Sequence, residues 1–285
     1  MVSHSKEHGV CLVADDYVRI EGIGSAIRPS IKGNTNIKPR HLGMCAIRAL
    51  LPRSLMESSE VTSIVLKSAS VWNSPDQTAS VICYPIRRGN YYNLVVVKNI
   101  PYPSSFTRSE LEALRDPKSV RGTFVDADPI VRQMLDYTDD YSVWSLSEIP
   151  PLDRWVSDEA AIALIGDAAH AMAPHLAQGA ALSIEDGIVL ADSLRRIHTK
   201  DDLGVVLAAY QTLRKERVDA IAAISRDLSA ARATLNNIPT DLAGGTVQRK
   251  LSKSGEAFSI VDLYFYDGLQ ETEKYFLANP IAMKR

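Results

Sequence analysis

The sequence has few of the features that mark several large classes of protein. Only three of its 285 residues are cysteines (Cys11, Cys45 and Cys83), and they form no CxxC pair. This usage excludes a disulfide scaffold and a cysteine zinc site. It predicts reduced, mostly buried thiols in a cytoplasmic protein. The first ten residues, MVSHSKEHGV, have neither the basic nor the apolar region of a secretory signal peptide.

Charge of one sign and long apolar runs are also scarce. Lysine and arginine total 32 against 34 aspartate and glutamate residues, a formal net charge of −2. So balanced a composition gives no basic surface for nucleic acid or an anionic membrane, and we expect neither as a partner. No run of about 18 apolar residues occurs, so we expect no membrane span. The 46% of hydrophobic residues is enough for a sizeable core in one large or two ordinary domains.

Strand patterns fill the stretch after about Arg40. Four runs rich in β-branched and aromatic residues are separated by turn residues: HLGMCAIRAL (41–50), EVTSIVLKSASVW (60–72), TASVICYPIR (78–87) and YYNLVVV (91–97). Runs of this kind predict an antiparallel sheet. Arg88-Gly89-Asn90 is the expected tip of one hairpin.

Helix signals follow these strands. SELEALR (109–115) and DPIVRQMLDY (128–137) predict short amphipathic helices, the second opened by Asp128 as N-cap and Pro129 in the first turn. A helix is expected over about 178–197, and a longer helix after it. One apolar stripe at about 3.6-residue spacing defines the longer helix: Leu203, Leu207, Tyr210, Leu213, Ile221, Ile224 and Leu228.

Two apolar stretches far apart in the sequence predict a second sheet. VCLVA (10–14) is a short buried strand, and AAIALIG (160–166) is apolar throughout, as in a parallel sheet covered on both faces. The order of elements therefore predicts an α/β fold with α+β elements: an α/β domain interrupted by an inserted antiparallel-sheet domain and followed by C-terminal helices.

The segment LIGDAAHAMAPHLAQGAALSIED (164–186) carries the strongest functional signal. A buried strand delivers Asp167 to its carboxyl end, the edge at which open α/β sheets bind ligands. Gly179 and Ala180 begin the next helix, where backbone N–H groups lack intrahelical partners and the dipole favours negative charge. Small side chains between them leave the backbone accessible. The pattern predicts a cradle for a flat, partly anionic ligand, while the simpler alternative is that Asp167 caps a turn and the alanines pack a tight connection.

This segment resembles the flavin-contacting part of the single-component FAD-dependent aromatic monooxygenases, in particular the salicylate-hydroxylase-like group with its fungal secondary-metabolite enzymes. Other pieces agree in order. GIGSAIRPSI (22–31) is similar to the end of the family's second cofactor motif, PLDRWVSDEAAIALIGD (151–167) to the approach to the flavin, and AAYQTLRKERVDAI (208–221) to the helical tail. The resemblance covers nearly the whole chain from about Val10.

The resemblance implies cofactor and substrate roles for six residues. Asp167 would bind the ribityl chain of FAD, Pro174 would lie against the isoalloxazine face, and Gly179 and Ala180 would offer backbone at its pyrimidine edge. Arg48 and Tyr84 match strand positions that face the substrate, where an arginine and a tyrosine hold a phenolate. The alternative for this pair is a surface ion pair for Arg48 and a core-filling role for Tyr84.

The implied reaction is hydroxylation of an aromatic or polyketide-like small molecule with NAD(P)H and O2. Competing sites are weaker. Asp167, His170 and His175 have the atom types of metal ligands, but without HExxH spacing we expect no metal, and both histidines are expected to bond to loop backbone. Ser25 in GIGSA is not framed as a hydrolase nucleophile elbow.

One departure from the family concerns its strand–GxGxxG–helix unit, which this sequence does not contain. Gly22-x-Gly24 is followed by Ile27 where the third glycine is needed, and Glu21 stands where the second motif has aspartate. We therefore expect a chain truncated at its N-terminus that binds FAD weakly and tends to aggregate. An inactive remnant acting at most as a binding module is the alternative function.

The predicted domains follow from this resemblance. Residues 1–38 are a remnant of the FAD-binding domain, and residues 39–155 form the β-rich substrate domain. Residues 156–200 return to the FAD-binding domain, and residues 201–285 form a C-terminal helical region.

Overall fold

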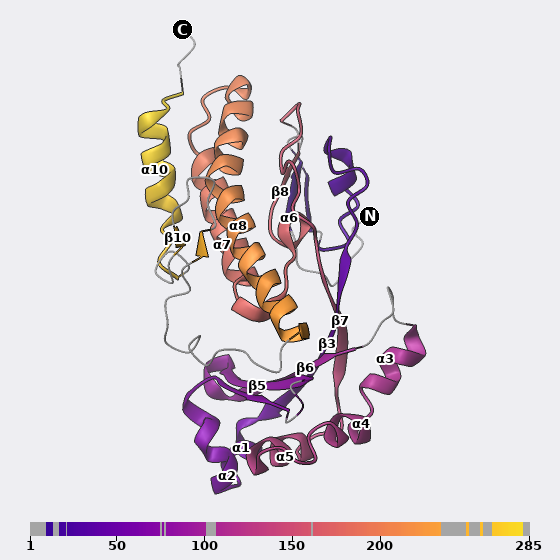
Figure 1. The fold of residues 1–285 in the computed structure, drawn as a ribbon. Helices are drawn as coiled ribbons and strands as arrows, with labels where there is room; N and C mark the ends of the chain where they lie inside the picture. Colours follow the sequence, from indigo (N-terminus) through magenta and orange to yellow (C-terminus); the bar gives the residue numbers. More distant parts are fainter. Residues whose placement is uncertain are drawn as a thin grey trace. The chain divides into compact units, whose positions relative to one another are not determined.

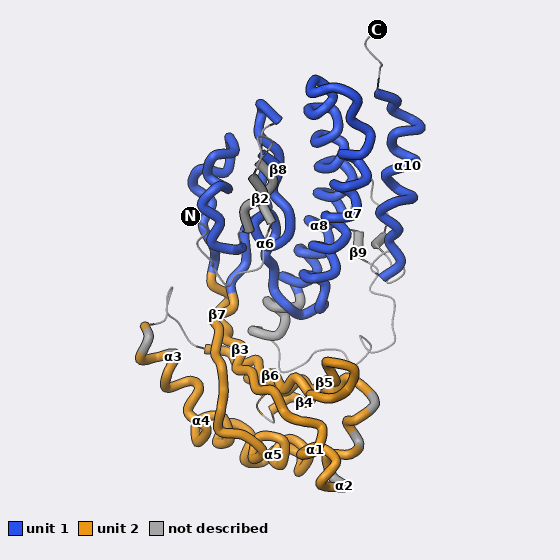
Figure 2. Tube along the Cα trace, turned by 180° about the vertical axis from the view of Figure 1, so that it is seen from behind, with its two compact units in different colours: residues 1–40, 147–229, 239–285 blue, residues 41–146, 230–238 orange. Residues whose placement is uncertain are grey.

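The computed structural model describes residues 10–13, 17–20, 22–74, 76, 78–100, 107–160, 162–234, 249–250, 257–258 and 264–281. The chain divides into two compact units, coloured separately in Figure 2. Unit 1 takes residues 1–40, 147–229 and 239–285, and unit 2 takes residues 41–146 and 230–238.

Unit 2 contains a five-stranded sheet in the order β4-β5-β6-β3-β7. Its strands are β3 (Arg40–Pro52), β4 (Ser70–Asn73), β5 (Ala79–Ile86), β6 (Tyr91–Asn99) and β7 (Ser142–Glu148). The β4–β5, β5–β6 and β6–β3 pairs are antiparallel, so the predicted antiparallel sheet is confirmed. The connection from β5 to β6 is a 3-10 turn, η3 (Arg87–Gly89), close to the predicted hairpin tip.

Short helices pack against one face of this sheet, as Figure 1 shows. They are α1 (Arg53–Glu57), α2 (Glu60–Ser63), α3 (Arg108–Leu114), α4 (Pro117–Gly122) and α5 (Pro129–Asp136). Every second side chain of a strand points to the same face. On β3 the inward residues Ile47, Ala49 and Leu51 are buried in this core.

The strand predicted over residues 60–72 is largely wrong. Glu60–Ser63 forms α2 and Ile64–Lys67 forms the 3-10 turn η2, so only the end of the run becomes β4. The hydroxyl of Thr62 donates to the carbonyl of Met56 at 2.7 Å, and Val65 is buried in the core. A helical turn buries these residues as well as a strand would, because a short apolar run does not reveal its own period.

Unit 1 contains a three-stranded sheet in the order β2-β1-β8, with β1 at Val10–Val13, β2 at Tyr17–Ile20 and β8 at Ile162–Leu164. Strands were predicted at 10–14 and 160–166, where Ala14 and Ala161 lie outside the described residues. The expected parallel pairing is wrong for these strands, since β1 pairs antiparallel with both β2 and β8. A continuous apolar run reports burial on both faces and carries no information on strand direction.

Unit 1 also contains helices, and the longer ones lie alongside one another in Figure 1. The helices are α6 (Asp167–His170), α7 (Gly179–Leu194), α8 (Leu203–Thr234) and α10 (Gly268–Ala278). The two predicted long helices are confirmed. Leu207, Tyr210 and Ile221 of the predicted stripe are buried in the core, whereas the side chain of Leu228 lies outside the description.

Smaller elements complete the described chain. They are the 3-10 turns η1 (Arg28–Ser30), η4 (Pro174–Leu176) and η5 (Lys200–Asp202) and the two-stranded pair β9 (Arg249–Lys250) and β10 (Ala257–Phe258). No helix in the described part of the chain combines the length and apolar character that a membrane crossing needs.

Both cysteines with described side chains are buried and free, as predicted. Burial raises the pKa of the Cys45 thiol to about 11, while Lys98 opposes the shift, and burial raises the pKa of Cys83 to about 12. Neither is therefore a ready thiolate nucleophile. The side chain of Cys11 lies outside the description.

One buried carboxylate in unit 1 is shared by two arginines. Glu148, at the end of β7, is 1% exposed and accepts from Arg40 Nε at 3.0 Å. It also accepts from Arg226 Nε of α8 at 3.2 Å. The carboxylate therefore ties the first residue of β3, the last residue of β7 and helix α8 together.

The start of α5 provides a test of the fold. Asp128 accepts from the backbone N–H of Ile130 at 2.8 Å, which confirms the predicted N-cap. We expect Asp128→Ala to lower the free energy of unfolding by ~1 kcal/mol in urea denaturation, because the helix loses its cap. Asp126→Ala, at an exposed position just outside the helix, is the control. Equal losses in the two variants would show that the cap does not stabilise α5.

Candidate functional site

The turn after β8 holds Gly166 and Asp167 in a conformation that needs glycine. Gly166 has φ +59°, and a Cβ built on it would lie 3.0 Å from Oγ of Ser183. Its N–H donates to Oδ2 of Asp186 at 2.9 Å. Asp167 follows as the first residue of α6 and is partly exposed. The backbone geometry of Gly166 and a buried hydrogen bond thus fix the position of the Asp167 backbone, from which its side chain extends.

The start of α7 lies next to this turn. Ser183, which touches the Gly166 position, donates its hydroxyl to the carbonyl of Gly179 at 2.9 Å. Within the described residues, Gln178 at the N-cap makes no side-chain capping bond, and a Cβ on Gly179 would meet nothing within 4 Å. Ala180 is exposed. The first N–H groups of this 16-residue helix are therefore left for another acceptor.

A hydrogen bond from α8 anchors the loop between α6 and α7. Ser225 of α8 donates to the carbonyl of Ala173 at 2.6 Å, immediately before Pro174. Pro174 is exposed at the start of η4, and Ala177 has a left-handed backbone at φ +53°. An apolar ring surface is thus presented outward by a loop that the core fixes.

Arg28, in the segment 22–31, reaches the same turn. Its side chain is buried, and its guanidinium donates to the carbonyl of Ala168 at 2.8 Å and to that of Ile23 at 2.7 Å. The Oγ of Ser25 accepts from the N–H of Arg28 at 3.0 Å. The structure thus brings the two sequence motifs together, although they are 140 residues apart along the chain.

Asp186 is the centre of a buried charge cluster under the turn. It is fully buried, and besides Gly166 it accepts from Nε of Arg214 at 2.8 Å and pairs with Nε2 of His170 at 2.6 Å. Burial opposes its ionisation, but His170, Arg214 and the Gly166 N–H together hold its pKa below the ordinary value. Since a carboxylate only accepts, His170 donates from Nε2.

The cluster continues through two arginines of α8. Arg214 is fully buried and also pairs with Glu185 at 2.8 Å, and Arg217 binds both oxygens of Glu185 at 3.0 Å. Burial opposes the charge on Arg214, but Asp186 and Glu185 raise its pKa above the ordinary value. Two carboxylates thus face two guanidinium groups, and each is hydrogen-bonded as buried charges require.

The expected role of His170 is wrong. It lies in a short helix and bonds to a carboxylate rather than to loop backbone, with its ring centroid 5.2 Å from that of buried Trp155. His175 lies in η4. Among the residues the structure describes, no three histidine, cysteine or acidic side chains have an arrangement that could hold a metal ion.

Arg48 and Tyr84 lie near one another on the sheet of unit 2. Their strands pair with opposite edges of β6, with Arg48 opposite Val95 and Tyr84 opposite Asn93. Because side chains alternate along a strand, both point away from the α1–α5 core. Nε of Arg48 donates to Oδ1 of Asn93, whose side chain is 2% exposed, while Tyr84 is 37% exposed.

The structure therefore places the six predicted residues in two groups. Asp167, Pro174, Gly179 and Ala180 belong to one turn–loop–helix system in unit 1, and Arg48 and Tyr84 share one sheet face in unit 2. The sequence analysis missed the residues that orient them: Asn93, Asp186 and Arg214. Residues 184–186 (IED) lie in the predicted helix, but nothing in these residues identifies Asp186 as the partner of the glycine turn.

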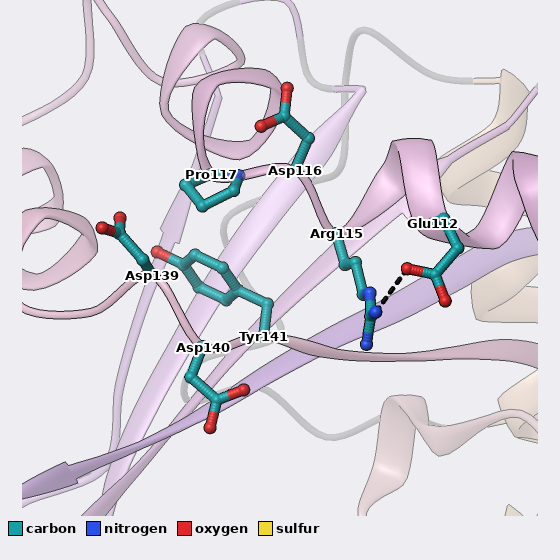
Figure 3. A pocket seen from close by; sticks show the side chains of 7 residues that line it. All are labelled: Glu112, Arg115, Asp116, Pro117, Asp139, Asp140 and Tyr141. Carbon is teal, nitrogen blue, oxygen red and sulfur yellow. Dashed lines mark ion pairs between the residues drawn. The ribbon is translucent and has the colours of Figure 1, made fainter.

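Unit 2 also contains a cavity of about 310 Å3, shown in Figure 3. None of the six predicted residues lines it, and its lining is rich in carboxylates: Glu112, Arg115, Asp116, Pro117, Asp139, Asp140 and Tyr141. Arg115 pairs with Glu112, and the Tyr141 hydroxyl donates to the Leu135 carbonyl at 2.9 Å. Burial raises the pKa of Tyr141 to about 12, with Arg121 opposing, so the phenol stays neutral.

Comparison with known proteins gives consistent matches. Residues 133–225 match the family described as FAD binding domain. The chain is 31% identical to FAD-dependent monooxygenase OpS4 of Beauveria bassiana over 213 residues, which is 74% of this chain and 48% of that protein. It is 29% identical to 3-hydroxybenzoate 6-hydroxylase of Klebsiella oxytoca over 225 residues, 78% of this chain and 52% of that protein. The chain thus spans about half the length of these curated relatives.

Solved structures agree on the fold. A salicylate hydroxylase in complex with substrate superposes with a TM-score of 0.68 at 24% identity, covering 99% of this chain and 71% of that one. HpxO of Klebsiella pneumoniae, complexed with FAD and uric acid, superposes with a TM-score of 0.60 at 18% identity, covering 82% and 57%. Together with the shared fold, these sequence matches support the FAD-dependent aromatic monooxygenase family. FAD is the cofactor of that family.

The residues around the turn fit a flavin. The exposed face of Pro174, the uncapped start of α7 and the open space beside Gly179 leave room for a flat ring against backbone donors. The partly exposed carboxylate of Asp167 is the type of acceptor that a ribityl hydroxyl needs. The fit therefore rests on shape and on donor chemistry in one turn–loop–helix system.

The buried cluster gives a stability prediction. We expect Asp186→Asn to lower the free energy of unfolding by ~3–5 kcal/mol, because it breaks a buried ion pair and leaves Arg214 with one carboxylate partner. Asp219→Asn is the control, since the 33% exposed Asp219 pairs with Lys215 on the helix surface and should cost at most ~0.5 kcal/mol.

The same variant predicts a pH dependence. The pKa of Asp186 is lowered in the folded state. Its contribution to the free energy of unfolding is therefore complete above the pKa of the unfolded state and is lost as pH falls through the pKa of the folded state. Urea unfolding at several pH values should show a constant difference between wild type and Asp186→Asn above about pH 5, shrinking below about pH 4. A difference independent of pH would contradict an ionised Asp186.

Proposed function

We propose that this chain forms the flavin-contacting and substrate-contacting parts of a monooxygenase that hydroxylates an aromatic or polyketide-like small molecule with NAD(P)H and O2. The observation that carries the proposal is the uncapped start of α7 beside a glycine turn fixed by buried Asp186. In the proposed division, residues 1–38 and 156–200 contribute to the FAD domain, residues 39–155 form the substrate domain and residues 201–285 are helical support.

On the cofactor side, Asp167 accepts a hydrogen bond from a ribityl hydroxyl, and Pro174 lies against the isoalloxazine face. The backbone of Gly179 and Ala180 meets the pyrimidine edge, where the helix dipole stabilises negative charge by ~0.3–2 kcal/mol. When bound, FAD supplies the redox chemistry that links oxidation of NAD(P)H to insertion of oxygen into the substrate. The residues of this chain hold and orient the ring.

On the substrate side, Arg48 and Tyr84 bind an acidic aromatic group. Arginine is a permanent cation and tyrosine a hydrogen-bond donor, so the pair favours a phenolate or a carboxylate over a neutral ring. Asn93 accepts from Nε of Arg48 and thereby directs the remaining guanidinium donors. One similar protein, 3-hydroxybenzoate 6-hydroxylase, is named for a substrate that has an acid and a ring of this kind.

An inactive remnant is the competing function. NADPH-dependent oxygen consumption by the chain with added FAD and an aromatic acid distinguishes the two, because a remnant would hold ligands without turnover. Absence of both FAD binding and oxygen consumption would contradict the proposed function.

The role of Asp167 predicts the effect of its removal. Asp167→Ala should weaken FAD binding about tenfold or more in a fluorescence titration, because a desolvated hydrogen bond to a charged acceptor contributes ~1.5–3 kcal/mol. Glu159→Ala, which removes an exposed acid of the same unit, should leave the dissociation constant unchanged. Equal affinities for wild type and Asp167→Ala would exclude this carboxylate from the flavin site.

The role of Arg48 predicts a separation of substrate and cofactor effects. Arg48→Lys keeps the charge but loses the planar fork, so the dissociation constant for 3-hydroxybenzoate should rise about tenfold while FAD affinity stays constant. The measurement is a ligand titration with FAD present, and Arg88→Lys at the exposed hairpin is the control. A loss of FAD affinity in Arg48→Lys, or no effect at all, would contradict the assignment.

A further inference from the structure

Tyr266 lies two residues before α10 and packs against two arginines of the buried charge cluster. The guanidinium carbon of Arg214 is 4.9 Å from its ring centroid, and that of Arg217 is 4.4 Å away. Burial raises the pKa of the phenol, with Arg214 opposing, so the ring stays neutral. Each cation within about 6 Å of the ring centroid is attracted by the quadrupole of the ring.

The rest of the C-terminal segment, residues 264–278, is fixed to α7. Figure 1 shows α10 running alongside α7. Asp267 caps α10 by accepting from the N–H groups of Leu269 and Gln270 at 3.1 Å. A Cβ on Gly268 would lie only 2.9 Å from Cγ2 of Val189, and Phe276 is buried with Arg196 4.9 Å over its ring. The packing of α10 against α7 therefore holds Tyr266 next to the two arginines.

A continuous chain of contacts leads from this ring to the glycine turn. Arg214 packs against Tyr266 and donates to Asp186 at 2.8 Å, and Asp186 accepts the N–H of Gly166 at 2.9 Å. Arg217 is linked through Glu185, the neighbour of Asp186, at 3.0 Å. All of these residues belong to unit 1.

We propose that the C-terminal segment sets the geometry of the flavin-contacting turn, with Tyr266 as a positioning residue that acts through Arg214 and Asp186. The inference rests on the proposed function, because it is FAD that this turn is proposed to hold. Tyr266 acts on the turn at a distance and is not proposed to touch the cofactor.

The ring is suited to this role because it restricts the arginines without competing for their hydrogen-bond acceptors. The centroid of the neutral ring lies 4.9 Å and 4.4 Å from the two guanidinium carbons. Arg214 still donates to Asp186 and to the carbonyl of Leu182, and Arg217 still donates to Glu185. The two acids and two arginines are balanced in charge, so a carboxylate in the place of Tyr266 would draw Arg214 away. Without the ring, Arg214 gains freedom to turn, and the acceptor of the Gly166 N–H loses its fixed partner.

Hydrogen–deuterium exchange of the full chain without FAD tests the inference directly. In Tyr266→Leu, exchange in peptides covering Gly166–His170 should be faster by about tenfold, because loss of a partly buried cation–π contact loosens Arg214. Peptides of β5 and β6 in unit 2 should exchange as in wild type. FAD affinity should fall by about the same factor, since a mobile turn must be ordered on binding.

Matched variants separate positioning from simple loss of packing. Tyr266→Phe keeps the ring and should restore slow exchange, and Tyr264→Leu, at a 59% exposed position, should behave as wild type. If Tyr266→Leu does not fold, Gly268→Ala is the second variant. It keeps every contacting side chain but crowds Val189, and it should also speed exchange at Gly166.

Each outcome decides one question. Unchanged exchange at Gly166–His170 in Tyr266→Leu, or in Gly268→Ala, overturns the positioning role even if FAD binds normally. Faster exchange spread over both units overturns it as well, because that result is general destabilisation. Faster local exchange in a chain that binds no FAD supports the coupling and refutes the proposed function instead.

Discussion

The structure of the candidate site depends on one buried carboxylate. Asp186 sits on α7, yet it accepts from the turn after β8, from α6 and from α8, so four elements meet at two oxygen atoms. A charge in this position is costly unless it is fully paired, and here three donors oppose the desolvation. Such a group tolerates few alternative arrangements. The backbone of Gly166 and the start of α7 are held in place because Asp186, which lies behind them, is restrained by three hydrogen-bond donors.

Much of the fold was predictable wherever a local signal matches the local structure. Asp128-Pro129 predicted the start of α5, and the apolar stripe predicted α8. The same Asp-Pro signal stands at Asp116-Pro117 and opens α4, although the sequence analysis predicts neither α4 nor β7. The run at 60–72 misled because its apolar residues are buried by helical turns, and the direction of β8 was not encoded in its own residues. Burial is readable locally, whereas direction and pairing depend on the partner strand.

The site divides in the same way. Asp167, Pro174, Gly179 and Ala180 were found because small residues and a helix start within one continuous segment have a local chemical meaning. Asn93 could not be found, since its contact with Arg48 depends on the register of β3 against β6. Arg214 lies 28 residues beyond Asp186, and arginines are common on helices, so only packing distinguishes it. A single sequence reveals which backbone a ligand can approach, but it does not reveal which buried side chains keep that backbone in place.

The shared carboxylate of Glu148 has a consequence for how the chain enters and leaves unit 1. The polypeptide passes out of the unit after Arg40 and returns shortly before Glu148, and these two residues are paired with each other. Arg226 adds a third attachment from α8. The outgoing strand β3 and the returning strand β7 are therefore joined by the ion pairs of Glu148 at the point where the chain leaves and re-enters unit 1. Because these ion pairs fix the two connections, insertions and deletions within residues 41–146 should leave the sheet and helices of unit 1 unchanged. Evolution can therefore remodel the inserted unit independently.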